Sequence, residues 1–129
     1  MNVLPVNLED LIHARSVESL RREFKGAWSD QTLDQTIRTI CAFANDFFNL
    51  NGGYIIIGID EQNGLPVLPP RGLEGYNLEE IQKQIRGNCK RIDPEYQPVI
   101  APEIYQEKPI LVIWAPAGDV RPYQAPETM

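Results

Sequence analysis

The stretch Gly52-Gly53-Tyr54-Ile55-Ile56-Ile57-Gly58-Ile59-Asp60 decides the fold of this chain. Its middle part, residues 54–59, is a continuous apolar run rich in β-branched side chains, which is typical of a strand buried on both faces. The glycine pair in front of that run tolerates the left-handed conformation that ends a helix. The last residue of the stretch opens a turn-forming segment at the carboxyl end of the strand. We therefore expect a central buried strand that follows directly on a helix.

Amphipathic patterns on both sides of this strand predict helices. The strongest covers residues 33–48, with apolar side chains at helical spacing, and Asp30 or Thr32 can cap it. A second helix is predicted over 78–92, and a short one over 7–15. The glycines that follow the strongest helix do not form a phosphate-binding loop, because such a loop follows a strand and opens a helix. We therefore expect no nucleoside triphosphate site in this chain.

The remaining patterns predict strands. Residues 18–25 alternate with period two, and residues 65–68 form a short returning strand. Residues 99–105 and 110–115 predict a hairpin, joined by the connection 106–109. The order of helices and strands predicts a single α+β domain, in which a mixed β-sheet packs with about three helices.

Length and charge limit the classes of function. The chain has 129 residues, of which 43% are hydrophobic, and this fits one domain. It carries 12 basic and 18 acidic residues, so its formal net charge is −6 at pH 7. That sign excludes a protein that coats nucleic acid through bulk charge. Any nucleic-acid role therefore requires a local basic patch.

Other sequence features bear on location and redox state. The longest uncharged apolar run, 54–59, is far shorter than the ~20 residues that a bilayer requires, and residues 1–10 lack a signal-peptide pattern. We expect a cytoplasmic protein with no membrane segment. Cys41 and Cys89 cannot form a disulfide framework, so we expect buried free thiols. His13 is the single histidine, which excludes a site built from several histidines.

Glu18, Glu23 and Asp60 form a first candidate site together with Lys25. Carboxylates are the ligands that Mg²⁺ and Mn²⁺ require, and a neighbouring lysine could stabilise charge on a phosphodiester. The alternation places Glu23 and Lys25 on one face of their strand, and Asp60 could lie beside that strand. In the alternative interpretation, Glu23 and Lys25 form an exposed ion pair and Asp60 is a turn residue.

A basic helix face is the second candidate. Lys83, Arg86, Lys90 and Arg91 fall opposite the apolar stripe of the predicted helix 78–92, with no acidic residue between positions 81 and 92. Such a face can neutralise phosphates. Charged residues also normally occupy the solvated side of an amphipathic helix, so that interpretation stays open. Trp114 could stack on a base, but packing within the hairpin is the simpler expectation.

Four motifs resemble the Schlafen AlbA-like domain family over residues 10–124. They are, in chain order, Glu18-Ser-Leu-Arg-Arg-Glu23-Phe24-Lys25, Ala42-Phe43-Ala44-Asn45, the stretch 52–60, and Arg121-Pro122-Tyr123. The resemblance implies an AlbA-like fold and nucleic-acid binding. In bacteria and archaea such domains stand at the start of proteins described as transcriptional regulators or helicase-like proteins, and they are regarded as DNA-binding.

The related domain of animal Schlafen proteins cleaves RNA, and the resemblance extends this activity to an alternative for the present chain. Carried over by motif, the acidic residues are Glu18, Glu23 and Asp60, and they would bind Mg²⁺ or Mn²⁺ with Lys25 as helper. The sequence departs from many members by the six residues 46–51 between two of the motifs. The animal enzymes use two such lobes, so a single lobe would have to form a homodimer.

The combined expectation is an AlbA-like domain over residues 1–124, with 125–129 as the start of a linker or of a continuation, since family members usually carry a further region there. The domain binds nucleic acid, DNA as first choice and RNA as second, with no resident cofactor. Its contacts would come from the basic helix face, Lys83, Arg86, Lys90 and Arg91, and from Arg21, Arg22 or Lys25 at the strand. One alternative is the metal-dependent endoribonuclease. The other is a dimerisation or sensor module that binds no nucleic acid.

Overall fold

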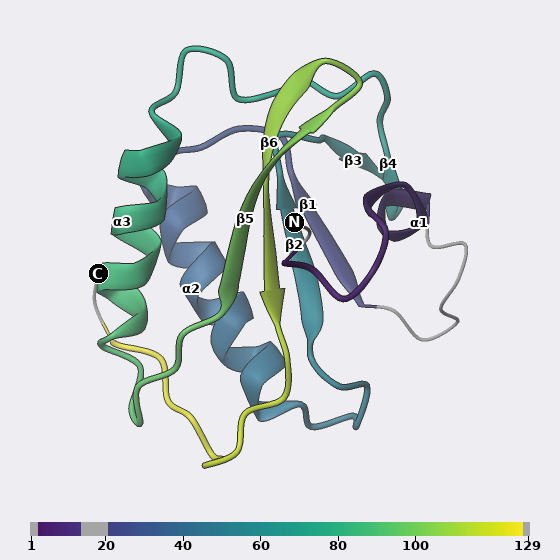
Figure 1. Cartoon of the computed structure of the whole chain (residues 1–129). Helices are drawn as coiled ribbons and strands as arrows, with labels where there is room; N and C mark the ends of the chain where they lie inside the picture. The colour runs from purple at the N-terminus through teal and green to yellow at the C-terminus, as the bar shows by residue number, and fades with distance from the viewer. Residues whose placement is uncertain (1–2, 14–20, 128–129) are drawn as a thin grey trace.

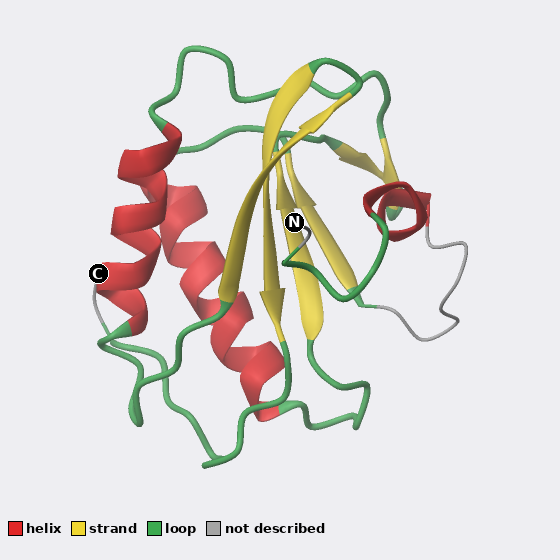
Figure 2. Cartoon of the chain, in the orientation of Figure 1, coloured by secondary structure: helices red, strands yellow, loops and turns green. Residues whose placement is uncertain are grey.

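The computed structural model describes residues 3–13 and 21–127, and Figure 2 shows their helices and strands. The main sheet has the order β1-β2-β6-β5. Its strands are β1 (Arg22–Lys25), β2 (Gly53–Ile57), β5 (Val99–Tyr105) and β6 (Lys108–Ala115). The pair β1 and β2 is parallel, whereas β2 with β6 and β5 with β6 are antiparallel. A second, two-stranded sheet pairs β3 (Glu61–Gln62) with β4 (Leu65–Pro66). The predicted mixed sheet is therefore confirmed.

Three helices accompany the sheet among the described residues, and they divide between its two faces. They are α1 (Leu8–His13), α2 (Asp30–Asn45) and α3 (Leu78–Cys89). Figure 1 shows α2 and α3 together on one side of the sheet and α1 on the other. The central strand β2 is buried along its whole length, as expected. Ile55 and Ile57 pack with α2 and α3, whereas Tyr54 and Ile56 pack with α1.

The end of α2 differs from the prediction. The helix stops at Asn45 rather than at residue 48, and Asp46 adopts the left-handed conformation with φ 48°. The carboxylate of Asp46 then accepts the backbone N–H groups of Leu50 and Asn51 at 2.9 and 3.0 Å. This side chain ties the next turn together, and Phe47 and Phe48 become exposed instead of extending the apolar stripe. At the other end the cap is Ser29, whose side chain accepts the N–H of Thr32, so the expected caps were wrong.

The loop at the β5–β6 hairpin is shorter than expected. The strands are joined by Gln106 and Glu107 alone, because β6 begins at Lys108. Both connecting residues have positive φ, at 48° and 68°. A two-residue hairpin turn of type I′ requires positive φ at both residues, and the sequence lacks the Asn-Gly or Asp-Gly pair that usually signals it.

The segment after β6 packs against the domain, although its composition resembles a linker. Gly118 N–H donates to the carbonyl oxygen of Ala44 at the end of α2 (2.8 Å). Tyr123 is buried in the same core cluster as α2 and α3. Asp93 and Gln124 exchange two backbone hydrogen bonds of 3.0 and 2.9 Å. Residues 118–124 are thus part of the domain, and Figure 1 shows this segment passing the end of α2.

Candidate functional site

Glu23 and Lys25 share the face of β1 that α2 covers. Their Cα partners on β2 are Ile55 and Ile57, which belong to the core on that side. Glu23 Oε2 accepts a hydrogen bond from Thr39 Oγ1 at 3.1 Å, and Lys25 Nζ donates to Gln35 Oε1 at 3.2 Å. The predicted common face is confirmed. Within the described part of the chain, the two side chains bind α2 and not each other.

Asp60 lies at the carboxyl ends of the two parallel strands. A Cβ atom placed on Gly26, the residue after β1, would stand 1.8 Å from Asp60 Oδ1, so the carboxylate rests directly on that backbone. Arg71 holds it with two hydrogen bonds, from Nε to Oδ2 and from Nη2 to Oδ1, both 2.9 Å. Asp60 therefore lies beside the end of β1, as expected, with both oxygens engaged by a guanidinium.

The described carboxylates alone do not form a site for a divalent cation. Glu23 and Asp60 both bind protein side chains, Thr39 and Arg71. Within residues 3–13 and 21–127, no group of three His, Cys, Asp or Glu side chains could hold a metal ion. Glu18, the third predicted ligand, lies outside the described residues. The three-carboxylate site thus stays a prediction that depends on Glu18.

The basic helix face lies on the exposed side of α3. Ile81, Ile85 and Cys89 of this helix are buried against α2 and the sheet. All four predicted basic residues are exposed: Lys83, Arg86, Lys90 and Arg91. Arg91 Nη1 donates to Asn88 Oδ1 at 3.3 Å. The charged groups of the other three have no hydrogen bond or ion pair with any side chain in the described part of the chain.

Arg22 has a role inside the fold. Its Nη1 donates to the carbonyl oxygens of Leu11 (3.3 Å) and Ile12, which end the short helix α1. The guanidinium also lies 5.2 Å from the centre of the Phe24 ring. Burial lowers the pKa of Arg22, and Glu61 opposes that shift. We therefore leave Arg22 out of the interface proposed below.

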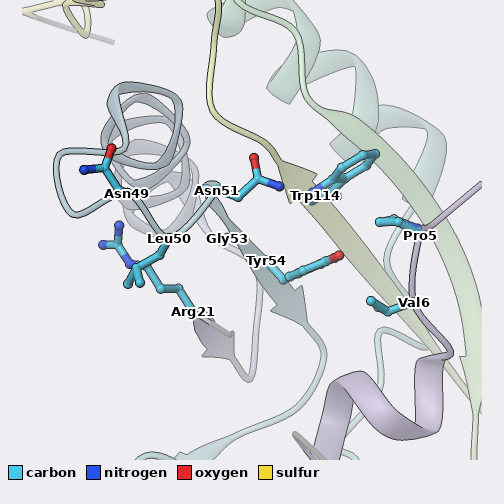
Figure 3. A pocket seen from close by; sticks show the side chains of 10 residues that line it. Pro5, Val6, Arg21, Asn49, Leu50, Asn51, Gly53, Tyr54 and Trp114 are labelled. Atoms are coloured by element: carbon cyan, nitrogen blue, oxygen red, sulfur yellow. The ribbon is translucent and has the colours of Figure 1, made fainter. Parts of the chain in front are cut away.

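A pocket at the start of β2 was missed by the sequence analysis. It measures about 450 Å³, and Figure 3 shows side chains that line it. Three of its segments are the N-terminal residues Pro5 and Val6, Arg21 in front of β1, and the loop 49–53. Tyr54 and Trp114 complete it from the neighbouring strands β2 and β6. The unusual length of the segment 46–51 was its only signal in the sequence.

Comparison with known proteins identifies the family. Residues 18–128 match the Schlafen, AlbA_2 family, so the chain belongs to that family, as its motifs indicated. No curated protein is detectably similar to it in sequence. Membership in this family suggests a nucleic-acid-related role. Within the described residues, no helix is both long and apolar enough to span a bilayer.

Two solved structures share the fold. The first is the N-terminal domain of a protein from Nitrosomonas europaea, described as related to the ATP-dependent DNA helicase RecG. It has a TM-score of 0.61 and 24% identity, and the match covers 85% of this chain and 71% of that one. The second is the DIP2311 protein of Corynebacterium diphtheriae, with a TM-score of 0.59 and 14% identity. That match covers 92% of this chain but 26% of the other.

Proposed function

We propose that this domain binds nucleic acid, with DNA as the first choice, through phosphate contacts made by the exposed basic face of α3. The observation that carries the proposal is the set Lys83, Arg86 and Lys90, whose charged groups form no hydrogen bond or ion pair in the described part of the chain. They recur three and four residues apart, so they follow one side of the helix. From the first to the last they extend over about 10 Å of the helix axis.

The distribution of charge favours contact at this one surface. The net charge of −6 repels a polyanion from most of the molecule. Glu79 stands four residues before Lys83 and is exposed, so its negative charge partly offsets the positive charge of Lys83. Binding should therefore be weak, sensitive to salt and independent of base sequence. In a transcriptional regulator, such a domain would hold the protein on DNA without reading its sequence.

Titrations of a labelled DNA duplex test the proposal, with RNA and single-stranded DNA of the same sequence beside it. Between about 50 and 200 mM salt, the logarithm of the binding constant should fall linearly with the logarithm of the salt concentration. The slope should be about −0.9 for each phosphate contacted in the duplex. Replacing Lys83, Arg86 and Lys90 by Gln should flatten that slope by about 2 to 3. Arg38→Gln and Lys108→Gln are matched controls, because both residues are basic, exposed in part and already paired with acids.

An affinity for the duplex that does not depend on salt would overturn the proposal, as would a triple variant that binds like the unchanged protein. Tighter binding of RNA than of duplex DNA would support the basic face of α3 as the binding surface, but with RNA as the preferred nucleic acid. The endoribonuclease and the dimerisation module stay as alternatives. Metal-dependent cleavage of tRNA that Glu23→Gln abolishes would favour the first, and a dimer that binds none of the oligonucleotides would favour the second.

A further inference from the structure

Gly87 is a glycine that the fold does not explain. Of the nine glycines in the chain, five have a positive φ, which other residues rarely adopt. At three others, a Cβ atom would stand 2.7 Å or less from another side chain: Gly26, Gly53 and Gly118. Gly87 has no positive φ, and a Cβ atom there would meet nothing within 4 Å apart from its own helix backbone and chain neighbours. Neither the backbone nor the packing of the described residues therefore requires a glycine at this position.

The position of Gly87 also lowers the stability of the helix. It lies inside α3, three residues before the C-cap Lys90, so it is not the glycine that ends a helix. A glycine inside a helix destabilises it relative to alanine, because its backbone loses more conformational freedom on folding. Residues that break a local rule of folding without a structural reason are expected at functional sites. We therefore looked for the function at the surface around Gly87.

That surface is the basic face of α3. On a helix, the nearest surface neighbours of a residue stand three and four positions away. Two such neighbours of Gly87 are Lys83 and Lys90, and all three residues are exposed. A third neighbour, Gln84, is half-buried, and its Oε1 accepts a hydrogen bond from Trp28 Nε1 at 3.1 Å. A bare stretch of helix backbone thus lies between two lysines whose ammonium groups form no ion pair with the described residues.

The spacing of these lysines puts Gly87 in the path of a ligand that contacts both. Lys83 and Lys90 are seven residues apart, which is about 10 Å along the helix axis, and Gly87 lies between them. A linear polyanion with phosphates on both ammonium groups passes over position 87. Any side chain there would hold the polyanion away from the helix. The missing side chain therefore shapes the same surface that the lysines charge.

We propose that Gly87 is the point at which the sugar–phosphate backbone of a bound nucleic acid lies directly against α3, with Lys83 and Lys90 on phosphates to either side. This inference rests on the proposed function and adds an uncharged positioning residue to it. Gly87 donates no hydrogen bond to the ligand, because N–H groups inside a helix bond within the helix. It acts only by leaving room for close approach.

Gly87→Leu separates this role from a structural one. Leucine is a good helix former, so thermal unfolding should show a variant more stable than the unchanged protein. Its affinity for a labelled DNA duplex at fixed salt should nevertheless fall about tenfold, because the added side chain overfills the contact. Gly87→Ala should also be more stable and should bind with an affinity between those of the other two. Ala42→Leu is the matched control, since Ala42 is exposed on the other long helix, α2, and this variant should bind like the unchanged protein.

A thiol at position 87 reports directly whether nucleic acid covers it. Cys41 and Cys89 are buried, so the thiol introduced by Gly87→Cys should be the one that reacts with an uncharged maleimide in the native protein. With duplex at about ten times its dissociation constant, the reaction should slow about tenfold, because only the free fraction reacts. The thiol of Ala42→Cys should react at the same rate with and without duplex.

The failure of this inference can be told apart from the failure of the proposed function. Gly87→Leu that binds like the unchanged protein would overturn the inference and leave the basic face in place. An equal loss of affinity in Ala42→Leu would do the same, as would a thiol at position 87 that the duplex does not protect. If the unchanged chain shows no salt-dependent binding of the duplex, the proposed function and this inference are both wrong.

Discussion

The side-chain amide of Asn45 forms a pair of hydrogen bonds with the backbone of Tyr123. Nδ2 donates to the carbonyl oxygen of Tyr123 at 2.9 Å, and Oδ1 accepts its N–H at 2.6 Å. Arg121 adds a contact from Nη1 to the carbonyl oxygen of Asn45 at 3.3 Å. The Ala-Phe-Ala-Asn and Arg-Pro-Tyr motifs, far apart in sequence, are therefore two halves of one structural connection.

Asn45→Ala should destabilise the domain by about 3 kcal/mol, because it leaves a buried donor and a buried acceptor of Tyr123 unsatisfied. Equilibrium unfolding in urea measures this loss. Gln124→Ala is a nearby control at an exposed side chain and should change stability by less than about 0.5 kcal/mol. A loss in Asn45→Ala as small as in the control would show that the pair contributes little.

Asp46 should make stability depend on pH in the acid range. Burial alone would raise the pKa of Asp46, but backbone N–H groups of Gly52, Leu50 and Asn51, together with Arg121, lower it below its ordinary value. A carboxyl group with a lowered pKa stabilises the native state above the unfolded pKa, about 4, and loses that contribution as pH falls through the native pKa.

Asp46→Asn tests this. The variant should have a lower free energy of unfolding than the unchanged protein. This difference should be largest above about pH 5 and should shrink as the pH falls below about 4. Urea midpoints measured for both proteins across that range give the comparison. A deficit that stays constant with pH would contradict the assigned role of the carboxylate.

Two glycine substitutions should have opposite effects on stability. Gly87 lies inside α3, and a Cβ atom added there would meet nothing within 4 Å apart from its own helix backbone and chain neighbours, so Gly87→Ala should stabilise by about 0.5–1 kcal/mol. Gly52 has φ +78°, and a Cβ atom there would lie 1.9 Å from the carbonyl oxygen of Ala115. Gly52→Ala should therefore destabilise by about 2 kcal/mol or more. Thermal unfolding of both variants checks the signs, and a shift of the same sign in both would contradict the prediction.

Both cysteines should be inert in the native protein. Burial raises the pKa of the Cys89 thiol to about 12 and also raises that of Cys41. The reactive thiolate is therefore scarce at pH 8, and both cysteines are buried. A chromogenic disulfide reagent should release colour from the chain only after urea is added. Immediate reaction of one thiol in buffer would show that the α2–α3 interface opens readily.

The central part of the fold could be predicted because its patterns are strong and local. The apolar run of β2 and the helical spacing in α2 and α3 identify these elements without knowledge of their neighbours. The end of α2 could not be predicted in this way, because Phe47 and Phe48 continue the apolar spacing. The carboxylate of Asp46 stops the helix by binding N–H groups farther along the chain. The spacing of apolar residues does not reveal that the helix ends at this carboxylate.

The basic face of α3 and the pocket at the start of β2 also differ in whether a local sequence pattern describes them. The basic face of α3 follows from helical spacing alone, so Lys83, Arg86 and Lys90 are exposed as expected. The pocket joins the N-terminal segment, Arg21, the loop 49–53 and two strands, so no local pattern describes it. The contact of the half-buried Arg22 with the end of α1 could not be predicted for the same reason. The alternating pattern of the strand indicates which residues share a face with Arg22, but not which element covers that face.

The place of Tyr123 in the core has a consequence for how the domain forms during its synthesis. The ring packs at 5.4 Å from that of Tyr96 in an edge-to-face arrangement, within the cluster formed by α2, α3 and the sheet. A nascent chain that has emerged only as far as β6 would have all its strands but an open gap in that cluster. On the ribosome, the domain should therefore gain resistance to protease late, when residues 118–124 emerge and close the gap.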